Sequence, residues 1–435
     1  MRIVVVGAGE VGKHLAKMLS KENHELVIID SDENRLKNLV ETNDLLTLRG
    51  NVTSKKLLME AGAGKADLFI AVTPWDDTNI VSAIMAKRLG AKLTVVRISN
   101  SEPMSRESRD IFISLGIDSF VYPEKIAAQE VSHILHKSGV STLVEFCDGR
   151  LLLLAVKIDK KRAAEENETY RAVAIQRNGK TIIPSGKVLF EPDDTVYMVT
   201  NQSGIKGILR HLGQKPEQIK QVMILGGTHI GRLIAKELDK EYHIKVIEAD
   251  RYKAYRLSNT LNNALVIQGD GTKADLLFEE GLRSTDVFVA VTDDSETNIL
   301  TCLLAKSEGV RNTIAEIENL DYINLAERLG IDTIINKKLI AAGHIYRYTL
   351  TSCVSMIKYL TAIDAEVLEF VAQPQSKVIG KPINKIDLPI EAIVGGLVRG
   401  KLGYIATDDI CIEPGDHLVI FSKPSVTKEV SKLFE

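Results

Sequence analysis

The residues of this sequence best suited to bind a ligand form a glycine-rich loop near its start. Residues 3–12 read IVVVGAGEVG and place Gly7, Gly9 and Gly12 in a G-x-G-x-x-G pattern. After an apolar strand, such glycines allow a tight turn, let the backbone approach a pyrophosphate and let the next helix pack on the strand. Asp30 ends the next apolar run, where its carboxylate can accept both hydroxyls of an adenosine ribose. The pattern predicts a dinucleotide site that favours NAD(H) over NADP, because Asp30 would repel a 2′-phosphate.

Four further residues are candidates for the same site because of their places in the expected sheet. Thr73 and Pro74 follow one apolar strand and Arg97 ends the next, and ligands of doubly wound sheets bind outside the carboxyl ends of the strands. Thr73 offers a hydroxyl and Arg97 a charge to phosphate, although a helix-cap or turn role for Thr73 and a surface ion pair for Arg97 remain open. Asn51 either reaches the adenine or serves as a turn residue. The loop residues Ala8, Glu10 and Val11 complete this set.

A second loop repeats the pattern with changes. Residues 222–231 read VMILGGTHIG, at an offset of 219 residues (226 minus 7), and keep Gly226 and Gly231 but have Thr228 in the middle. The Cβ of Thr228 should crowd a pyrophosphate, and Glu316, at the position of Arg97, should repel phosphates. We therefore expect the first site to be the stronger one for a phosphate-rich ligand, with a ligand-free structural copy as the alternative for the second. The other candidates here are Gly227, His229, Ile230, Glu248, Asp270, Thr292 and Asp293.

The repeat extends well beyond the loops. Residues 72–100 align without gaps with residues 291–319, and the shared residues include the pairs Thr73/Thr292 and Asn79/Asn298. This period is far longer than that of solenoid repeats, so whole domains have been duplicated.

Within each half, short continuous apolar runs alternate with segments of helical periodicity. This is the pattern of buried parallel strands joined by helices. We expect strands at 3–6, 26–29, 45–48, 68–72 and 93–98 with helices at 11–19, 32–40 and 79–89, and second-half strands at 222–225, 245–247, 264–267, 287–291 and 313–316. The predicted fold is α/β, with two tandem Rossmann-like, doubly wound parallel sheets.

Each half ends in a small α+β tail, whose pattern differs from that of the part before it. Helices are expected at 126–136 and 339–359, followed by short β-like runs with turns such as Glu191-Pro192-Asp193-Asp194 and Glu413-Pro414-Gly415-Asp416. The polar stretch 214–220 reads as a central linker. The predicted domains are 1–138 and 219–355 for the nucleotide-binding parts, and 139–216 and 356–435 for the tails.

Composition narrows the function classes. The net charge of −3 and the aromatic content of 5% argue against nucleic acid as a partner. No apolar run approaches the roughly 18 residues of a membrane span and no signal peptide is recognised, so direct membrane insertion is not expected. The four cysteines stand far apart without a C-x-x-C pair, which predicts a reducing cytosol, no disulfide framework and no metal site.

Together the two loops, Asp30 and the repeated Val-Thr-x-x-Asp-x-x-Asn motif at 72–79 resemble the TrkA family, the regulatory subunits of bacterial and archaeal Trk potassium uptake systems. In the second half the motif reads Val-Thr-Asp-Asp-Ser-Glu-Thr-Asn at 291–298. The resemblance covers nearly the whole chain and implies two RCK-N domains, each followed by an RCK-C domain.

The resemblance also implies function. It implies a cytoplasmic homo-oligomeric ring, a dimer or tetramer, held at the inner face of the cell membrane by a TrkH- or TrkG-type potassium channel subunit. It implies that NAD(H) and ATP or ADP change the ring's conformation and so gate K⁺ flux. NAD contacts would fall on Gly7–Val11, Asp30, Thr73-Pro74 and Arg97, and in the second half on Gly226–Ile230, Glu248 and Glu316.

An NAD-dependent oxidoreductase is the alternative reading. Hydride transfer needs an acid or base beside the nicotinamide, usually from a substrate domain. His14, His133, His136 and His229 do not stand in such a setting, and a duplicated half leaves no unique substrate domain. A non-catalytic nucleotide sensor without catalytic residues is therefore expected.

Overall fold

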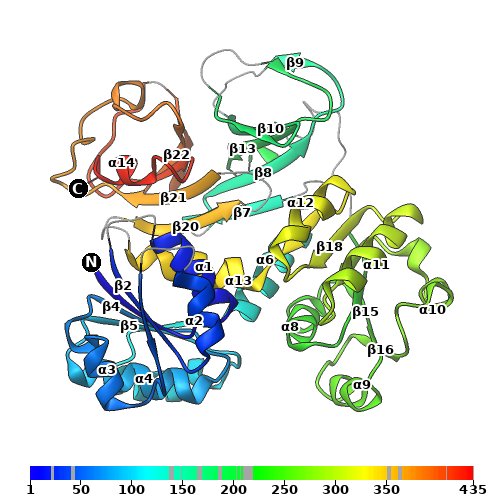
Figure 1. Cartoon of the computed structure of the whole chain (residues 1–435). Coiled ribbons are helices and arrows are strands. Elements are labelled where there is room, and N and C mark those ends of the chain that lie inside the picture. The colour runs from blue at the N-terminus through cyan, green and yellow to red at the C-terminus, as the bar shows by residue number, and fades with distance from the viewer. Residues whose placement is uncertain are drawn as a thin grey trace. The chain divides into compact units, whose positions relative to one another are not determined.

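The computed structural model describes the chain except residues 21–23, 41–44, 137–141, 148, 164–168, 185–188, 202, 206, 209–218, 350–353, 361–364, 408 and 435. The chain folds into two compact units, and Figure 1 labels their helices and strands. One comprises Met1–Ile126 with Lys337–Leu350, and the other Ala127–Asn336 with Thr351–Glu435. None of the described helices combines the length and apolar character needed to cross a membrane.

A six-stranded parallel sheet in the order β3-β2-β1-β4-β5-β6 forms the core of the first unit. Its strands are β1 (Arg2–Val6), β2 (Glu25–Asp30), β3 (Leu46–Arg49), β4 (Leu68–Ala71), β5 (Leu93–Arg97) and β6 (Ser119–Val121). Its helices are α1 (Glu10–Leu19), α2 (Glu33–Val40), α3 (Lys55–Glu60), α4 (Asp76–Leu89), α5 (Arg106–Leu115) and the start of α6 (Pro123–His136). Residues Ile3–Val6 of the central strand are 0% exposed, as expected for a parallel strand covered on both faces.

The order in which successive strands are added reverses at the centre of this parallel sheet. Strand β1 pairs with β2 on one side and with β4 on the other. Such a switch point opens a crevice at the carboxyl ends of the two central strands, where ligands of doubly wound sheets bind. The predicted Rossmann-like class is confirmed.

The second half repeats this sheet in the order β16-β15-β14-β17-β18-β19, again parallel throughout. The strands are β14 (Gln221–Leu225), β15 (His243–Glu248), β16 (Leu265–Gln268), β17 (Val287–Ala290), β18 (Asn312–Glu316) and β19 (Thr333–Ile335). The helices are α8 (His229–Leu238), α9 (Arg251–Ser258), α10 (Ala274–Glu279), α11 (Ser295–Ser307) and α12 (Leu320–Arg328). The predicted strands of both halves coincide with observed ones to within two residues at either end.

The predicted helix 339–359 is wrong in its second part. Helix α13 (Lys337–Tyr346) ends early, and β20 (Val354–Leu360) is a strand that pairs with β21 (Ala365–Val371). The apolar residues of this stretch fit either period, and pairing with a neighbouring strand decided between them. Helix α13 belongs to the first unit, where it packs on α1, and Lys338 Nζ lies 3.7 Å from Glu10 Oε2.

Both tails are antiparallel sheets of five strands, and both lie in the second unit. The first, in the order β11-β10-β13-β8-β7, contains β7 (Thr142–Phe146), β8 (Leu151–Lys157), β10 (Tyr170–Arg177), β11 (Lys180–Ile182) and β13 (Thr195–Thr200). The second, in the order β20-β21-β24-β22-β23, adds β22 (Ala392–Arg399), β23 (Leu402–Ile405) and β24 (His417–Ser422) to β20 and β21, and α14 (Thr427–Ser431) follows it. Buried residues of the two sheets, among them Leu153, Val199, Val367 and Phe421, form one shared hydrophobic core.

The two tails repeat one another in a buried ion pair. The guanidinium of Arg177 donates to both carboxylate oxygens of Asp194, at 2.9 and 2.7 Å, and Arg399 does the same to Asp416, at 2.9 and 2.8 Å. Both aspartates are 1% exposed and close the Glu-Pro-x-Asp turns recognised in the sequence. Of the predicted linker 214–220, residues 214–218 lie outside the described residues, and the predicted domain boundaries remain predictions.

Candidate nucleotide-binding sites

The first glycine loop has the backbone that its sequence predicts. Gly7 has φ +105°, and a Cβ there would lie 3.0 Å from the backbone nitrogen of Thr73. A Cβ on Gly12 would lie 1.9 Å from the carbonyl oxygen of Gly7, so only glycine lets α1 pack this closely on the loop. Gly9 is different, because a Cβ on it would meet no atom within 4 Å. The middle glycine therefore faces open space, as a position that approaches a ligand would.

Asp30 is held in place by the loop itself. Its Oδ2 accepts a hydrogen bond from the Ala8 amide at 2.6 Å, and its Oδ1 accepts one from the Asp32 amide at 2.8 Å. The side chain is 7% exposed. Each carboxylate oxygen has a second lone pair, so the geometry leaves Asp30 able to accept ribose hydroxyls while the backbone fixes its orientation.

Asn79 joins the ends of β4 and β5 and was not among the predicted site residues. Its Oδ1 accepts hydrogen bonds from the amide and hydroxyl of Thr73, at 2.9 and 2.7 Å. Its Nδ2 donates to the carbonyls of Thr73 and Arg97, at 2.9 and 3.0 Å. The Thr73 hydroxyl thus takes the turn role that the sequence left open, and the repeat of Asn79 at Asn298 was the signal that could have identified it.

Arg97 does not form a simple surface ion pair. One guanidinium nitrogen lies 3.6 Å from Glu124 Oε1, and the side chains are 21% and 10% exposed. Within the described part of the chain, Arg97 Nε and Glu124 Oε2 are buried without a hydrogen-bond partner. Burial raises the pKa of Glu124, and the charges of Arg97 and Lys337 oppose that rise. Buried polar atoms without partners are costly, and their position near the carboxyl end of β5 suits a polar ligand.

The second loop keeps the turn and changes the middle residue. Gly226 has φ +104°, and a Cβ on Gly231 would lie 2.1 Å from the carbonyl oxygen of Gly226. Thr228 is the N-cap of α8, and its hydroxyl donates to the Val291 carbonyl at 2.7 Å and accepts from the Gly231 amide at 3.3 Å. The side chain therefore has a capping function that glycine in the first loop lacks.

Glu248 reproduces the arrangement of Asp30. Its Oε2 accepts a hydrogen bond from the Gly227 amide at 2.7 Å, its Oε1 accepts one from the Asp250 amide at 2.8 Å, and it is 7% exposed. A Cβ on Gly227 would lie 2.2 Å from Leu257 and 2.8 Å from Glu248 Oε2. Gly227 is therefore needed for the loop to reach the carboxylate.

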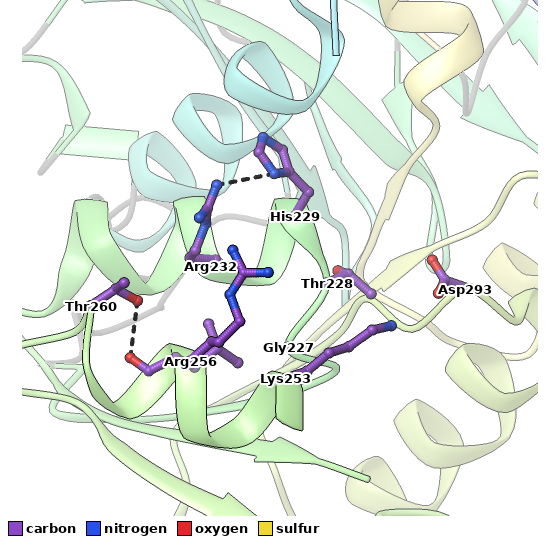
Figure 2. A pocket seen from close by; sticks show the side chains of 9 residues that line it. Gly227, Thr228, His229, Arg232, Lys253, Arg256, Thr260 and Asp293 are labelled. Atoms are coloured by element: carbon purple, nitrogen blue, oxygen red, sulfur yellow. Dashed lines mark hydrogen bonds between the residues drawn. The ribbon is translucent and has the colours of Figure 1, made fainter. Parts of the chain in front are cut away.

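A pocket of about 320 Å³ opens in front of the second loop. Its lining combines loop residues with three basic side chains, and Figure 2 shows Arg232, Lys253 and Arg256 around the space beside the loop. Asp293 and His229 also line it, and the ring of His229 lies 3.1 Å from the Arg232 guanidinium. Three cations beside a helix N-terminus favour an anionic ligand such as a nucleotide phosphate.

Two sequence expectations for this half need qualification. Glu316 is 3% exposed and does not line this pocket, and the phosphate repulsion expected from it stays a prediction. Arg232, Lys253 and Arg256 were missed by the sequence interpretation, although Arg232 directly follows the third glycine of the pattern. The ranking of the first site above the second stays a prediction, now with a cationic pocket on the side of the second.

The remaining candidates divide between the loop and nearby turns. Asn51 Oδ1 accepts from the amide and hydroxyl of Thr53, and Asp270 Oδ1 does the same with Thr272, so both take the turn role. Thr292 is held by Asn298 as Thr73 is by Asn79. Pro74 and Glu10 are exposed, whereas Val11 and Ile230 are buried beneath their loops.

Comparison with known protein families gives matches in both halves of the chain. A family model described as TrkA-N domain matches residues 3–123 and 222–337, and one described as TrkA-C domain matches residues 367–435. This chain belongs to the TrkA family. The two TrkA-N matches coincide with the two Rossmann-like sheets, and the resemblance inferred from the loops and the repeated motif is confirmed.

Relatives within the TrkA family align along the entire chain. The Trk system potassium uptake protein TrkA of Haemophilus influenzae is 32% identical over 453 residues, which cover 100% of this chain and 99% of the relative. The Trk system potassium uptake protein TrkA homolog 1 of Methanosarcina mazei is 32% identical over 456 residues and is covered completely, as is this chain.

Solved structures show the same fold at lower identity. The crystal structure of the GsuK RCK domain aligns with a TM-score of 0.61 and 16% identity over 99% of this chain and 94% of that one. A structure described as the GsuK channel bound to NAD aligns with a TM-score of 0.62 and 15% identity over 99% and 78%. This TrkA-family chain therefore shares the fold of these RCK structures over nearly its entire length.

Proposed function

We propose that this chain is the regulatory subunit of a Trk-type potassium uptake system and that it binds adenine nucleotides, NAD(H) and ATP or ADP, at both glycine loops. One observation carries the proposal. In each half a buried carboxylate accepts a hydrogen bond from the glycine loop, Asp30 from Ala8 at 2.6 Å and Glu248 from Gly227 at 2.7 Å. This holds a ribose-binding acceptor beside a phosphate-binding helix N-terminus.

The phosphates would be held differently in the two halves. In the first, the amides at the start of α1 and the Arg97 guanidinium, with its buried Nε, are available. In the second, Arg232, Lys253 and Arg256 surround the loop. The relatives that are Trk potassium uptake proteins and the RCK structure described as bound to NAD support this assignment.

The output would be conformational. A nucleotide shifts a conformational equilibrium only by its difference in affinity for the two states. We propose that the chain forms a homo-oligomeric ring on the cytoplasmic side of a TrkH- or TrkG-type membrane subunit, and that nucleotide binding changes K⁺ flux through that partner. No reaction is assigned to either site.

Thermal-shift titration of the full chain with NAD⁺, NADH, ATP and ADP tests the binding step. A ligand at about 100 times its Kd stabilises the folded state by about 2.7 kcal/mol. We expect Asp30→Asn to remove the first-site shift, Glu248→Gln the second, and the double variant both. The exposed pair Glu60→Gln and Glu279→Gln, which end α3 and α10 at matching places, should leave all shifts unchanged.

The regulatory step has its own readout. Rubidium flux through proteoliposomes holding a TrkH-type partner should respond to nucleotide with the wild type and not with the double variant. The absence of any nucleotide-induced stabilisation of the wild type would refute the binding proposal. Turnover of NADH with a panel of oxoacids would instead support an oxidoreductase.

A further inference from the structure

Three side chains with metal-binding chemistry, none of them part of either glycine loop, meet at the rim of the shared core of the two tails. One ligand atom from each of Cys147, Glu369 and His417 lies within 4.8 Å of the other two. Cys147 belongs to the first tail, whereas Glu369 and His417 belong to the second, and all three are in the same unit. The cluster therefore joins side chains of the two tails that lie more than two hundred residues apart in the sequence.

The strand register explains why these side chains meet. Glu369 lies two residues from Val367 on β21, and His417 lies two residues from Val419 on β24. Residues two apart on a strand share a face, and both valines face the shared core. Glu369 pairs with Val419, and His417 with Val371, so Glu369 and His417 are diagonal neighbours on one face. Cys147 directly follows β7, packs against the same core and has φ +52°, so the turn at the end of β7 sets its direction.

The existing contacts already orient the group. Glu369 is 6% exposed, and its Oε2 accepts a hydrogen bond from the Cys147 amide at 3.1 Å. Its Oε1 lies 2.8 Å from His417 Nδ1. Cys147 is half-buried, and the His417 side chain is 38% exposed. A buried carboxylate fixed from both sides, with a thiol and an imidazole beside it and an opening to solvent, is a preorganised arrangement with an entry path.

We propose that Cys147, Glu369 and His417 form a binding site for a divalent transition-metal ion of the zinc type that links the two tail domains. Thiolate, imidazole and carboxylate are the ligands that Zn²⁺ takes in proteins, at about 2.3 Å for sulfur and about 2.0–2.2 Å for nitrogen and oxygen. In tetrahedral geometry these bonds separate the ligand atoms by about 3.2–3.8 Å, so the observed spacing needs shifts of less than about 1.5 Å. Water would complete the coordination. A site of hard oxygen ligands for Ca²⁺ or Mg²⁺ would not include a thiol.

The consequence is a metal-dependent tail interface. The metal would add a cross-link between the end of β7 of the first tail and β21 and β24 of the second, beside the shared apolar core and the hydrogen bond from the Cys147 amide to Glu369. Metal bound to the folded state but not to the unfolded chain raises stability. The sequence prediction of no metal site rested on spacing along the chain, which does not reveal side chains that meet across strands.

Metal loading of the full chain tests the proposal. After chelator treatment and desalting, the protein is loaded with Zn²⁺, and bound metal is measured by elemental analysis, with Co²⁺ loading as a spectroscopic probe. We expect about one metal per chain at this site and a thiolate-to-cobalt charge-transfer band. Cys147→Ser should abolish the band, and His417→Asn should weaken Zn²⁺ binding at least as much as the about 10–100-fold loss known for outer-shell partners.

Cys411→Ser is the matched control, because Cys411 is an exposed cysteine of the second tail outside the cluster, and it should keep both the band and the stoichiometry. Nucleotide-induced thermal shifts report whether each variant is folded. A cobalt-loaded Cys411→Ser protein without a charge-transfer band, or a folded Cys147→Ser protein with wild-type Zn²⁺ affinity, would overturn the proposal. The band in Cys411→Ser decides the question even when Cys147→Ser fails to fold.

Discussion

The side-chain amide of Asn79 donates a hydrogen bond to the backbone carbonyl of Arg97 at 3.0 Å and thereby ties the ends of two neighbouring strands together. The same amide group holds Thr73 by its amide, hydroxyl and carbonyl. Asn298 forms the equivalent bonds to Thr292 and Glu316. This buried bridge gives the threonine and the asparagine of the shared motif the same structural role in both halves.

Asn79→Ala should weaken nucleotide binding at the first site indirectly, by removing the bonds that hold Thr73 and Arg97 in place. The change leaves the buried amide and carbonyl of Thr73 without partners, which costs about 1–3 kcal/mol for each unsatisfied group. We expect a lower Tm and a lower first-site affinity in calorimetric titrations, with Asn298→Ala as the matched change in the second half. Wild-type affinity in a folded Asn79→Ala variant would show that the bridge does not position the site.

Gly9→Ala and Gly12→Ala should separate ligand binding from folding. A Cβ on Gly12 would lie 1.9 Å from a carbonyl oxygen, whereas one on Gly9 meets nothing within 4 Å. Gly12→Ala should lower stability by about 1–3 kcal/mol or more through overpacking. Gly9→Ala should keep the Tm of the free protein and lose the nucleotide-induced shift of the first site, while the shift of the second site remains. Equal Tm values for the two free variants would contradict the close packing of α1.

Lys253→Ala should weaken phosphate binding at the second loop. Lys253 lines the cationic pocket, and a charge-assisted hydrogen bond contributes about 1.5–3 kcal/mol. We therefore expect an increase of about tenfold or more in the Kd for ATP or ADP at this site, and a weaker dependence of the Kd on salt. Lys273→Ala, an exposed lysine of the same half, serves as the control. An unchanged Kd would place the phosphates elsewhere.

Glu327 makes stability depend on pH in a direction opposite to that of a paired carboxylate. Burial raises the pKa of Glu327 to about 7 from 4.5. Between these values the folded chain keeps a proton that the unfolded chain releases, so stability falls as pH rises from about 4.5 to 7. Glu327→Gln should therefore raise stability at pH 8 by about 1–3 kcal/mol and change little at pH 4.

Denaturant unfolding at the two pH values checks this prediction. Glu279→Gln, an exposed carboxylate of the same half, should show no such difference. A Glu327→Gln variant that is equally more stable, or equally less stable, at both pH values would indicate a packing effect and not a proton-linked one.

Much of the fold could be predicted because it depends on local pattern. Continuous apolar runs identified the parallel strands, and glycines identified the turns, since a Cβ at Gly7 or Gly12 would strike backbone atoms nearby in the fold. The stretch 339–359 could not be resolved in this way, because apolar spacing there fitted both a helix and a strand. Pairing of β20 with β21 made its second part a strand.

By itself the sequence determined that two related Rossmann-like folds exist and which carboxylate ends the second strand of each, because those choices depend on residues close in the chain and on a repeat. Only the tertiary structure decided what surrounds the sites. It brought Arg232, Lys253 and Arg256 to the second loop, gave Asn79 its bridging role and set Cys147 beside Glu369 and His417. These contacts depend on strand order, register and helix packing, which link residues far apart in the chain and leave no periodic trace in it.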